Sequence, residues 1–212
     1  LGESGGTITC TGSPTLGFER WRQPTANWTP ATSTIKLEGH TRTFQTNGYG
    51  VPYNLEINNS GKTNQLSDFV QVTNNLTIAA GTLDTSSSNH AITVTKDVSV
   101  TGTLTGNASA ITAGSITINS GGTYSATSAT TTLTSESGAG YHIKNDGTFT
   151  HNNGTVTITG PTDSHAEIRG FTSSHPLNNL ILNNATGSGV ETRIVGNIQI
   201  ERDFTLTDGH FD

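Results

Sequence analysis

The stretch that decides the fold reads Val70-Gln71-Val72-Thr73-Asn74-Asn75-Leu76-Thr77-Ile78-Ala79-Ala80-Gly81-Thr82-Leu83-Asp84. A related stretch occurs a second time, without a gap, as Ile198-Gln199-Ile200-Glu201-Arg202-Asp203-Phe204-Thr205-Leu206-Thr207-Asp208-Gly209-His210-Phe211-Asp212. Similarity within one chain indicates that a structural unit is reused, as in repeat proteins. Because the second copy stops at the position of Asp84, we expect the sequence to end inside a unit.

Two further matches show that the repeated unit is much longer than this stretch. Thr34-Ile35-Lys36-Leu37 corresponds to Thr155-Val156-Thr157-Ile158, and Asn54-Leu55-Glu56-Ile57 corresponds to Asn179-Leu180-Ile181-Leu182. The matches keep their order, and their offsets grow by a few residues, as expected when loops absorb insertions. We predict one unit over about 34–154 and a second from about 155, truncated at 212, after an N-terminal cap or irregular segment at 1–33.

A finer period lies inside the long one. Gly-Thr followed by a bulky residue recurs about every 20 to 25 residues, a spacing typical of solenoid coils. The occurrences are Gly81-Thr82-Leu83, Gly102-Thr103-Leu104, Gly122-Thr123-Tyr124 and Gly147-Thr148-Phe149. Around them apolar and polar residues alternate, as in Ile92-Thr93-Val94-Thr95, which places the apolar side chains of a strand on one face. We therefore expect short, half-buried strands and an all-β fold.

Two architectures accommodate such strands. A β-sandwich pairs neighbouring strands through tight turns, and turn sequences of this kind occur at Asn47-Gly48 and Asp146-Gly147. The coil-length period favours a parallel β-helix (β-solenoid), in which each coil buries its apolar row on the next. At this period the chain would form roughly nine short coils, with the β-sandwich as the alternative.

Residues 1–33 lack the alternation and contain both tryptophans, Trp21 and Trp28. The first interpretation is a cap whose aromatic side chains cover the open end of the repeat core. The second is an aromatic surface for a sugar ring, with Trp21, Trp28 and Tyr49 as candidate glycan contacts.

Composition excludes some partners. The chain has 10 basic and 16 acidic residues, a formal charge of -6, and no basic stripe, so nucleic acid is not an expected partner. No apolar run is long enough to span a membrane, and the sequence has no Met. A Thr-, Asn- and Gly-rich composition is common among bacterial and viral surface proteins. We expect a portion of a longer extracellular, cell-surface or virion-surface protein.

A catalytic interpretation rests on acidic residues in polar, turn-like stretches. The candidates are Asp146, Asp163 and Glu167, with His142, His151 or His165 nearby in the sequence. Glycan hydrolysis requires paired carboxyl groups, one to donate a proton and one to attack or to activate water. Solvated loop charges are the simpler interpretation, and motifs for a nucleophile elbow, a phosphate loop or a zinc helix do not occur. We predict no enzyme and no catalytic, cofactor-binding or metal-binding residue.

Threonines recur in Thr-x-Thr patterns. The series comprises Thr93/Thr95, Thr101/Thr103/Thr105, Thr132/Thr134, Thr148/Thr150 and Thr155/Thr157/Thr159. On flat stacked strands they would present a lattice of hydroxyl groups, as in ice-binding solenoids. Their uneven spacing, and the interruption by Lys96 and Asp97, argue against such a lattice. The β propensity and the solubility of threonine are the simpler explanation.

At Tyr53-Asn54-Leu55-Glu56-Ile57-Asn58-Asn59-Ser60-Gly61, Asn75-Leu76-Thr77-Ile78 and Gly81-Thr82-Leu83-Asp84, the chain resembles repeats of very large bacterial surface proteins, filamentous adhesins and structural proteins of environmental phages. The resemblance implies a structural or adhesive β-solenoid segment of a longer extracellular filament, cell-surface or virion fibre protein. A carbohydrate-binding or polysaccharide-degrading β-helix is the alternative, and an ice-binding solenoid is a weaker one. Expected partners are neighbouring repeats or further copies of the chain, with a surface glycan as a candidate ligand.

Overall fold

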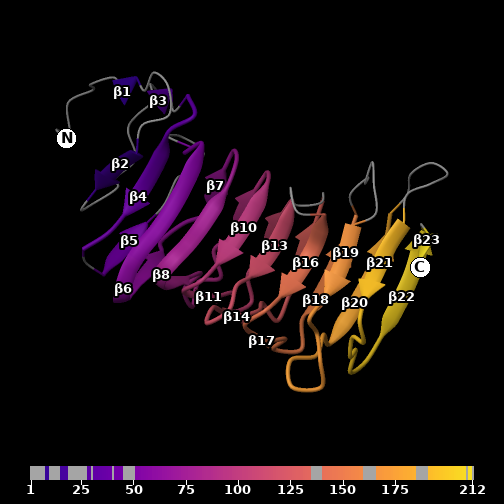
Figure 1. Cartoon of the computed structure of the whole chain (residues 1–212). Coiled ribbons are helices and arrows are strands. Elements are labelled where there is room, and N and C mark those ends of the chain that lie inside the picture. The colour runs from indigo at the N-terminus through magenta and orange to yellow at the C-terminus, as the bar shows by residue number, and fades with distance from the viewer. Residues whose placement is uncertain are drawn as a thin grey trace.

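The computed structural model describes residues 8–9, 15–18, 28–29, 31–39, 41–44, 51–134, 140–159, 166–184, 191–208 and 210–211. Within these ranges every regular element is a β-strand, and every strand pairing is parallel. The strands wind around one core as a three-sided solenoid, whose turns succeed one another from the N-terminal to the C-terminal side of Figure 1. The predicted parallel β-helix is confirmed, and the β-sandwich alternative is wrong, because a sandwich of hairpins requires antiparallel neighbours.

Two faces of the solenoid belong to one large sheet, which the long strands β6 and β8 join by bending around a corner. The first face contains β2 (Thr15–Phe18), β4 (Thr34–Leu37), the first part of β6 (Asn54–Leu66), the first part of β8 (Leu76–Asp84), β10 (Asp97–Val100), β13 (Ser115–Ile118), β16 (Tyr141–Asn145), β19 (Ala166–Arg169), β21 (Glu191–Val195) and β23 (His210–Phe211). The second face contains β5 (Arg42–Phe44), the last parts of β6 and β8, β11 (Thr103–Thr105), β14 (Thr123–Ser125) and β17 (Thr148–Thr150).

The third face is a separate seven-stranded sheet. It contains β7 (Val70–Val72), β9 (Ile92–Val94), β12 (Ile111–Ala113), β15 (Thr130–Leu133), β18 (Thr155–Ile158), β20 (Asn179–Asn183) and β22 (Phe204–Asp208). Seven strands lie on this face, which gives about seven turns. The first face contains ten strands, so the predicted number of roughly nine coils is approximate. The turns also differ in length: Val98 pairs with Ile116, whereas Ile116 pairs with Ile143.

The inward side of each face is apolar because the strands alternate as the sequence predicts. In β4, β10 and β18 half-buried and buried residues follow one another strictly. In-register pairing stacks the buried residues of successive turns into columns, such as Leu55, Leu76, Val98 and Ile116 on the first face. Together the columns form one continuous core, and burial of this apolar surface is the main stabilising contribution.

The Gly-Thr motif marks the corner between the first and second faces. Its threonines pair in register from turn to turn as Thr82, Thr103, Thr123 and Thr148. The finer sequence period is therefore one solenoid turn. A Cβ atom on Gly81 would lie 2.0 Å from the carbonyl oxygen of Asn59, and the φ of Gly81 is 78°. Only glycine allows the backbone of successive turns to approach so closely at this corner.

An aromatic column fills the core beneath the second face. Tyr124 and Phe149 pair in register with ring centroids 5.7 Å apart, and Phe171 follows at 5.1 Å from Phe149. The hydroxyl group of Tyr124 lies 2.9 Å from that of Thr131. Burial raises the pKa of Tyr124 to about 12, because a charged phenolate is disfavoured away from water. This tyrosine is a structural side chain.

The two copies of the repeated sequence lie on different faces. β4, β6 and β8 are neighbours on the first face, whereas their sequence counterparts β18, β20 and β22 are neighbours on the third face. The repeated sequence thus encodes the same strands and strand connections on two different faces of the solenoid. The division into units at about 34–154 and from about 155 stays a prediction.

Residues 1–33 are described only in part. β1 (Ile8–Thr9) pairs with β3 (Trp28–Thr29) in a two-stranded sheet, and β2 adds a strand to the first face beside β4. The described part of this segment is therefore parallel β structure. That it caps the core stays a prediction.

Candidate functional site

Threonines from separate segments of the chain meet on the outer surface of the third face. Thr93 of β9, Thr112 of β12, Thr132 of β15 and Thr157 of β18 are paired in register. Strands of a sheet are about 4.8 Å apart, so these side chains form a straight and regular row. None of them is buried, and the row is accessible to a ligand.

Further rows lie two residues before and two residues after this central row, at a distance of about 6.6 Å along the strands. We call the whole lattice the threonine face. Its members are Thr93, Thr95, Thr112, Thr130, Thr132, Thr134, Thr155, Thr157 and Thr159, with Ala91, Ala110 and Gly114 at the remaining positions. All twelve positions are uncharged. Thr112 was missed at the sequence level because it stands in no Thr-x-Thr pair, and Thr130 was left out of the series although it lies two residues before Thr132.

One row of the threonine face has its hydroxyl groups fixed by the main chain. They donate to carbonyl oxygens of the preceding turn: Thr95 to Val72 at 3.5 Å, Thr134 to Ala113 at 3.2 Å and Thr159 to Leu133 at 3.4 Å. The same contact in different turns selects the same χ1 rotamer, since a β-branched side chain has few alternatives. The three threonines of this row, which Gly114 interrupts, therefore share the orientation of their methyl and hydroxyl groups.

The two sequence arguments against a regular lattice are wrong. Uneven spacing along the chain disappears in the structure because the differences in length lie in the connections between faces, whereas the strands stay in register. Asp97 begins β10 on the first face, where its carboxylate accepts a hydrogen bond from Ser115 at 2.7 Å. Lys96 precedes it at the corner, so neither charge lies on the threonine face.

A second threonine row lies on the second face, but it is not part of a comparable lattice. Its members are Thr63, Thr82, Thr103, Thr123 and Thr148, paired in register. The adjoining row includes Asp84, whose carboxylate accepts hydrogen bonds from Gln65 at 3.5 Å and from Asn107 at 2.7 Å. Thr103/Thr105 and Thr148/Thr150 of the sequence series thus belong to a surface with a charged centre.

Asp146 and Glu167, the two suggested carboxylates that the structure describes, do not form a catalytic pair. Asp146 makes an ion pair with Lys144 just after β16. Glu167 lies near the start of β19, about four residues from Asp146 along the strand direction, on the order of 13 Å. Catalytic carboxyl pairs are about 5 to 9.5 Å apart. Asp163 lies outside the described residues.

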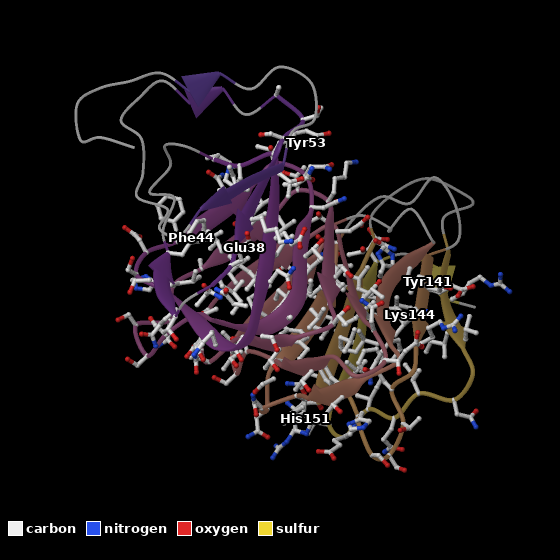
Figure 2. All side chains as sticks on the ribbon, turned by 60° about the vertical axis from the view of Figure 1, so that its left-hand side comes forward. Glu38, Phe44, Tyr53, Tyr141, Lys144 and His151 are labelled. Atoms are coloured by element: carbon white, nitrogen blue, oxygen red, sulfur yellow. The ribbon has the colours of Figure 1, made fainter. Side chains whose placement is uncertain are left out.

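The candidate histidines do not complete such a site either. His142 is fully buried in β16. The Nε2 atom of His151 lies 3.1 Å from a carboxylate oxygen of Glu201, and Figure 2 shows this histidine well away from Tyr141 and Lys144. His165 lies outside the described residues. Neither described candidate histidine is therefore an exposed partner of Asp146 and Glu167.

The candidate glycan contacts stay predictions. The backbone of Trp28 is part of β3, whereas Trp21 and Tyr49 lie outside the described residues. Across the described ranges, groups of three or more His, Cys, Asp or Glu side chains suited to a metal ion do not occur. The same part of the chain contains no helix of the length and apolarity that a membrane crossing requires.

Compared with known proteins, the chain matches no family model, no curated protein and no solved structure. Its solenoid architecture therefore rests on its own strand pairing. The resemblance to surface adhesins and phage structural proteins stays a prediction.

Proposed function

We propose that this chain is a rigid structural segment of a longer extracellular filament, cell-surface or virion fibre protein. The observation that supports the proposal is the in-register stack from β4 to β20, in which each turn pairs with the turn before and the turn after it. One core runs through the whole stack. A fold of this kind transmits force along its axis without a separate domain that could yield first.

The rod extends by repetition. Each turn adds about 4.8 Å of length and contacts only its neighbours, as in other solenoids. Removing a whole turn should therefore leave the contacts of the remaining turns intact. A domain that depends on one unique arrangement, such as an enzyme, would not tolerate the same change.

Deletion of residues 97–114 tests the proposal because it removes β10, β11 and β12 together. Ser115 then takes the place of Asp97, and Ile116 takes the place of Val98 above Leu76, as the register shows. We expect a folded protein whose maximum dimension in small-angle X-ray scattering falls by about 5 Å. Deletion of residues 97–105 is the matched control, because it removes β10 and β11 but leaves β12. The strand of the third face would then follow directly where a strand of the first face is needed, so cooperative unfolding should be lost.

Two outcomes would contradict the structural role. One is loss of folding in the whole-turn deletion, which would show that the turns are not exchangeable units. The other is turnover of a glycan by the intact chain in a reducing-sugar assay, which would favour the polysaccharide-degrading alternative despite the separation of Asp146 and Glu167.

A second candidate function, binding to ice, is favoured by the threonine face. Its hydroxyl and methyl groups repeat at about 4.8 Å in one direction and about 6.6 Å in the other. The oxygen rows on the prism faces of ice repeat at similar distances. A flat, uncharged and pre-ordered lattice can hold water in an ice-like arrangement without a further loss of side-chain entropy.

Thermal hysteresis and inhibition of ice recrystallisation test this second function. Thr132→Tyr inserts a bulky side chain at the centre of the threonine face and should abolish most of the activity. Thr103→Tyr is the matched control, because Thr103 is also a half-buried strand threonine but lies on the second face. Absence of activity in the wild-type chain, or equal loss in both variants, would eliminate ice binding.

A further inference from the structure

The outer surface of the first face carries one continuous row of side chains whose charge changes along the rod. The row reads Lys36, Glu56, Thr77, Ser99, Thr117, Lys144, Arg169 and Val195, each paired in register with the next. At its start the opposite charges of Lys36 and Glu56 face each other, 3.5 Å apart. Near its end two like charges, Lys144 and Arg169, occupy directly opposed positions.

A like-charged pair on neighbouring strands is unfavourable for the fold. The Lys36 and Glu56 pair shows that the same row accommodates complementary charges. Local conflicts of this kind are expected at functional sites, where stability is given up for binding. Lys144 is paired with Asp146, so the excess positive charge beside it comes from Arg169 and is available to a ligand.

Tyr141 holds the two cations together. The Nζ atom of Lys144 lies 5.4 Å from the centroid of its ring, and the Cζ atom of Arg169 lies 5.1 Å from it. Nη1 of Arg169 donates a hydrogen bond of 3.3 Å to the Tyr141 hydroxyl group. An aromatic ring that attracts both cations offsets part of their repulsion and fixes their positions before a ligand binds. Figure 2 shows Tyr141 and Lys144 side by side on the outer surface.

One further cation, Arg193, and two carboxylates, Asp146 and Glu167, surround Lys144 and Arg169. Glu167 pairs in register with Tyr141 on one side and with Arg193 on the other, and Arg193 is exposed. Asp146 pairs with Lys144, whose side chain is 20% exposed. The described site thus combines Lys144, Arg169 and Arg193 with two carboxylates, in a chain whose formal charge is -6. This is a local anion site and not the broad basic surface that nucleic acids require.

We propose that Lys144, Arg169, Arg193 and Tyr141 form a binding site for an acidic polysaccharide, a chain of sugars that carry carboxylate or sulfate groups. The planar guanidinium groups of the two arginines can each bind such a group through paired hydrogen bonds. Lys144 and Arg169 follow one another at about the strand spacing of 4.8 Å, which is close to the length of one sugar unit. The row therefore matches acidic groups on successive sugars of an extended chain.

This site adds an adhesive function to the rod and does not depend on the rod's mechanical role. Loss of glycan binding would leave the result of the turn deletion unchanged, and the reverse also holds.

Binding of the intact chain to immobilised polymers tests the proposal. The probes are alginate for carboxylates, heparin for sulfates and dextran as the neutral polymer. We expect binding to one or both acidic polymers, weakening as salt is added, and no binding to dextran. The double variant Lys144→Gln/Arg169→Gln should bind at least about tenfold more weakly. A preference for alginate or heparin identifies the acidic group.

Lys36→Gln is the matched control for this experiment. It removes a cation from the same row, where Lys36 is already paired with Glu38 and Glu56, and should change binding less than twofold. Arg193→Gln provides a second variant at an exposed position if the double variant does not fold. Equal binding of the wild-type chain to dextran, or an equal loss in Lys36→Gln, would overturn the proposal.

Discussion

The strands β4, β6 and β8 and their sequence counterparts β18, β20 and β22 build two different faces with the same internal contacts. In the first set Asn54 donates to the hydroxyl group of Thr34 at 3.4 Å and accepts from the amide of Asn75 at 3.3 Å. In the second set Asn179 makes the corresponding contacts with Thr155 and with the amide of Asp203, both at 3.3 Å. The start of each strand is thus tied to its neighbours by the same asparagine ladder.

The outer surfaces of the two sets differ at two of the three central positions. The central outward row is Lys36, Glu56 and Thr77 in the first set and Thr157, Ile181 and Thr205 in the second. The comparison teaches that inward residues and strand-end asparagines specify this fold, whereas outward residues remain available for binding. The threonine face and the acidic-glycan site both use that freedom.

The largest expected effect distinguishes the two sets by their depth in the stack. Ile78 is fully buried, whereas its counterpart Leu206 is 50% exposed on β22. Ile78→Ala should lower the free energy of unfolding by about 2 to 5 kcal/mol through lost burial and a cavity, and Leu206→Ala by less than about 1 kcal/mol. Urea unfolding followed by circular dichroism measures both, and equal losses would contradict the assigned depth.

The corner glycine provides a second test within the first set. Gly81→Ala should destabilise the fold by about 3 kcal/mol, because it combines a positive φ with a Cβ atom 2.0 Å from a carbonyl oxygen. Gly39 has a positive φ of 91°, but no atom lies within 4 Å of the added Cβ. Gly39→Ala should therefore cost only the backbone strain, about 1 to 2 kcal/mol. A similar thermal unfolding temperature for the two variants would show that turn-to-turn contact is not decisive.

The asparagine ladder predicts similar effects in the two sets. Asn54→Ala removes a side chain that donates one hydrogen bond and accepts two, from the side chain of Asn74 at 2.8 Å and from the main chain of Asn75. Asn179→Ala removes one that donates one hydrogen bond and accepts one. Each should lower the free energy of unfolding by about 1 to 2 kcal/mol, and Asn54→Ala should have the larger effect. A large effect in one set and none in the other would mean that the shared contacts do not carry equal weight.

The smallest effect is expected when the outer residues of one set are placed on the other. Lys36→Thr/Glu56→Ile copies Thr157 and Ile181 onto the first face and removes an ion pair of side chains that are about one-quarter exposed. Surface ion pairs contribute little to stability. The free energy of unfolding, measured by urea unfolding, should therefore change by no more than about 0.5 kcal/mol. A loss comparable to that of Ile78→Ala would show that the outer row also specifies the fold.

The period of the turns could be read from the sequence because its cause is local. Gly102 and Gly122 stand where the added Cβ would lie within 2.5 Å of a main-chain oxygen, so every copy of the corner requires glycine followed by a strand. The register of the threonine face could not be predicted in this way. Thr112 and Thr132 become neighbours only because the intervening loops return the chain to the same position in the next turn.

The site at Tyr141, Lys144 and Arg169 was even less visible. Tyr141 and Arg169 are separated by a sequence gap of 28 residues, and neither carries a recognisable motif. Asp146 and Glu167 belong to successive turns, but they lie at different positions along their strands and are not neighbours.

The sequence by itself determined the strands, the corners and the length of most turns, because alternation, glycine strain and asparagine turns act within a few residues. It also showed that one pattern was used twice. Only the tertiary structure decided that the second copy of the pattern lies on another face, and which outward side chains are neighbours. Both depend on the number of residues in each solenoid turn, which determines the residues that pair between successive turns.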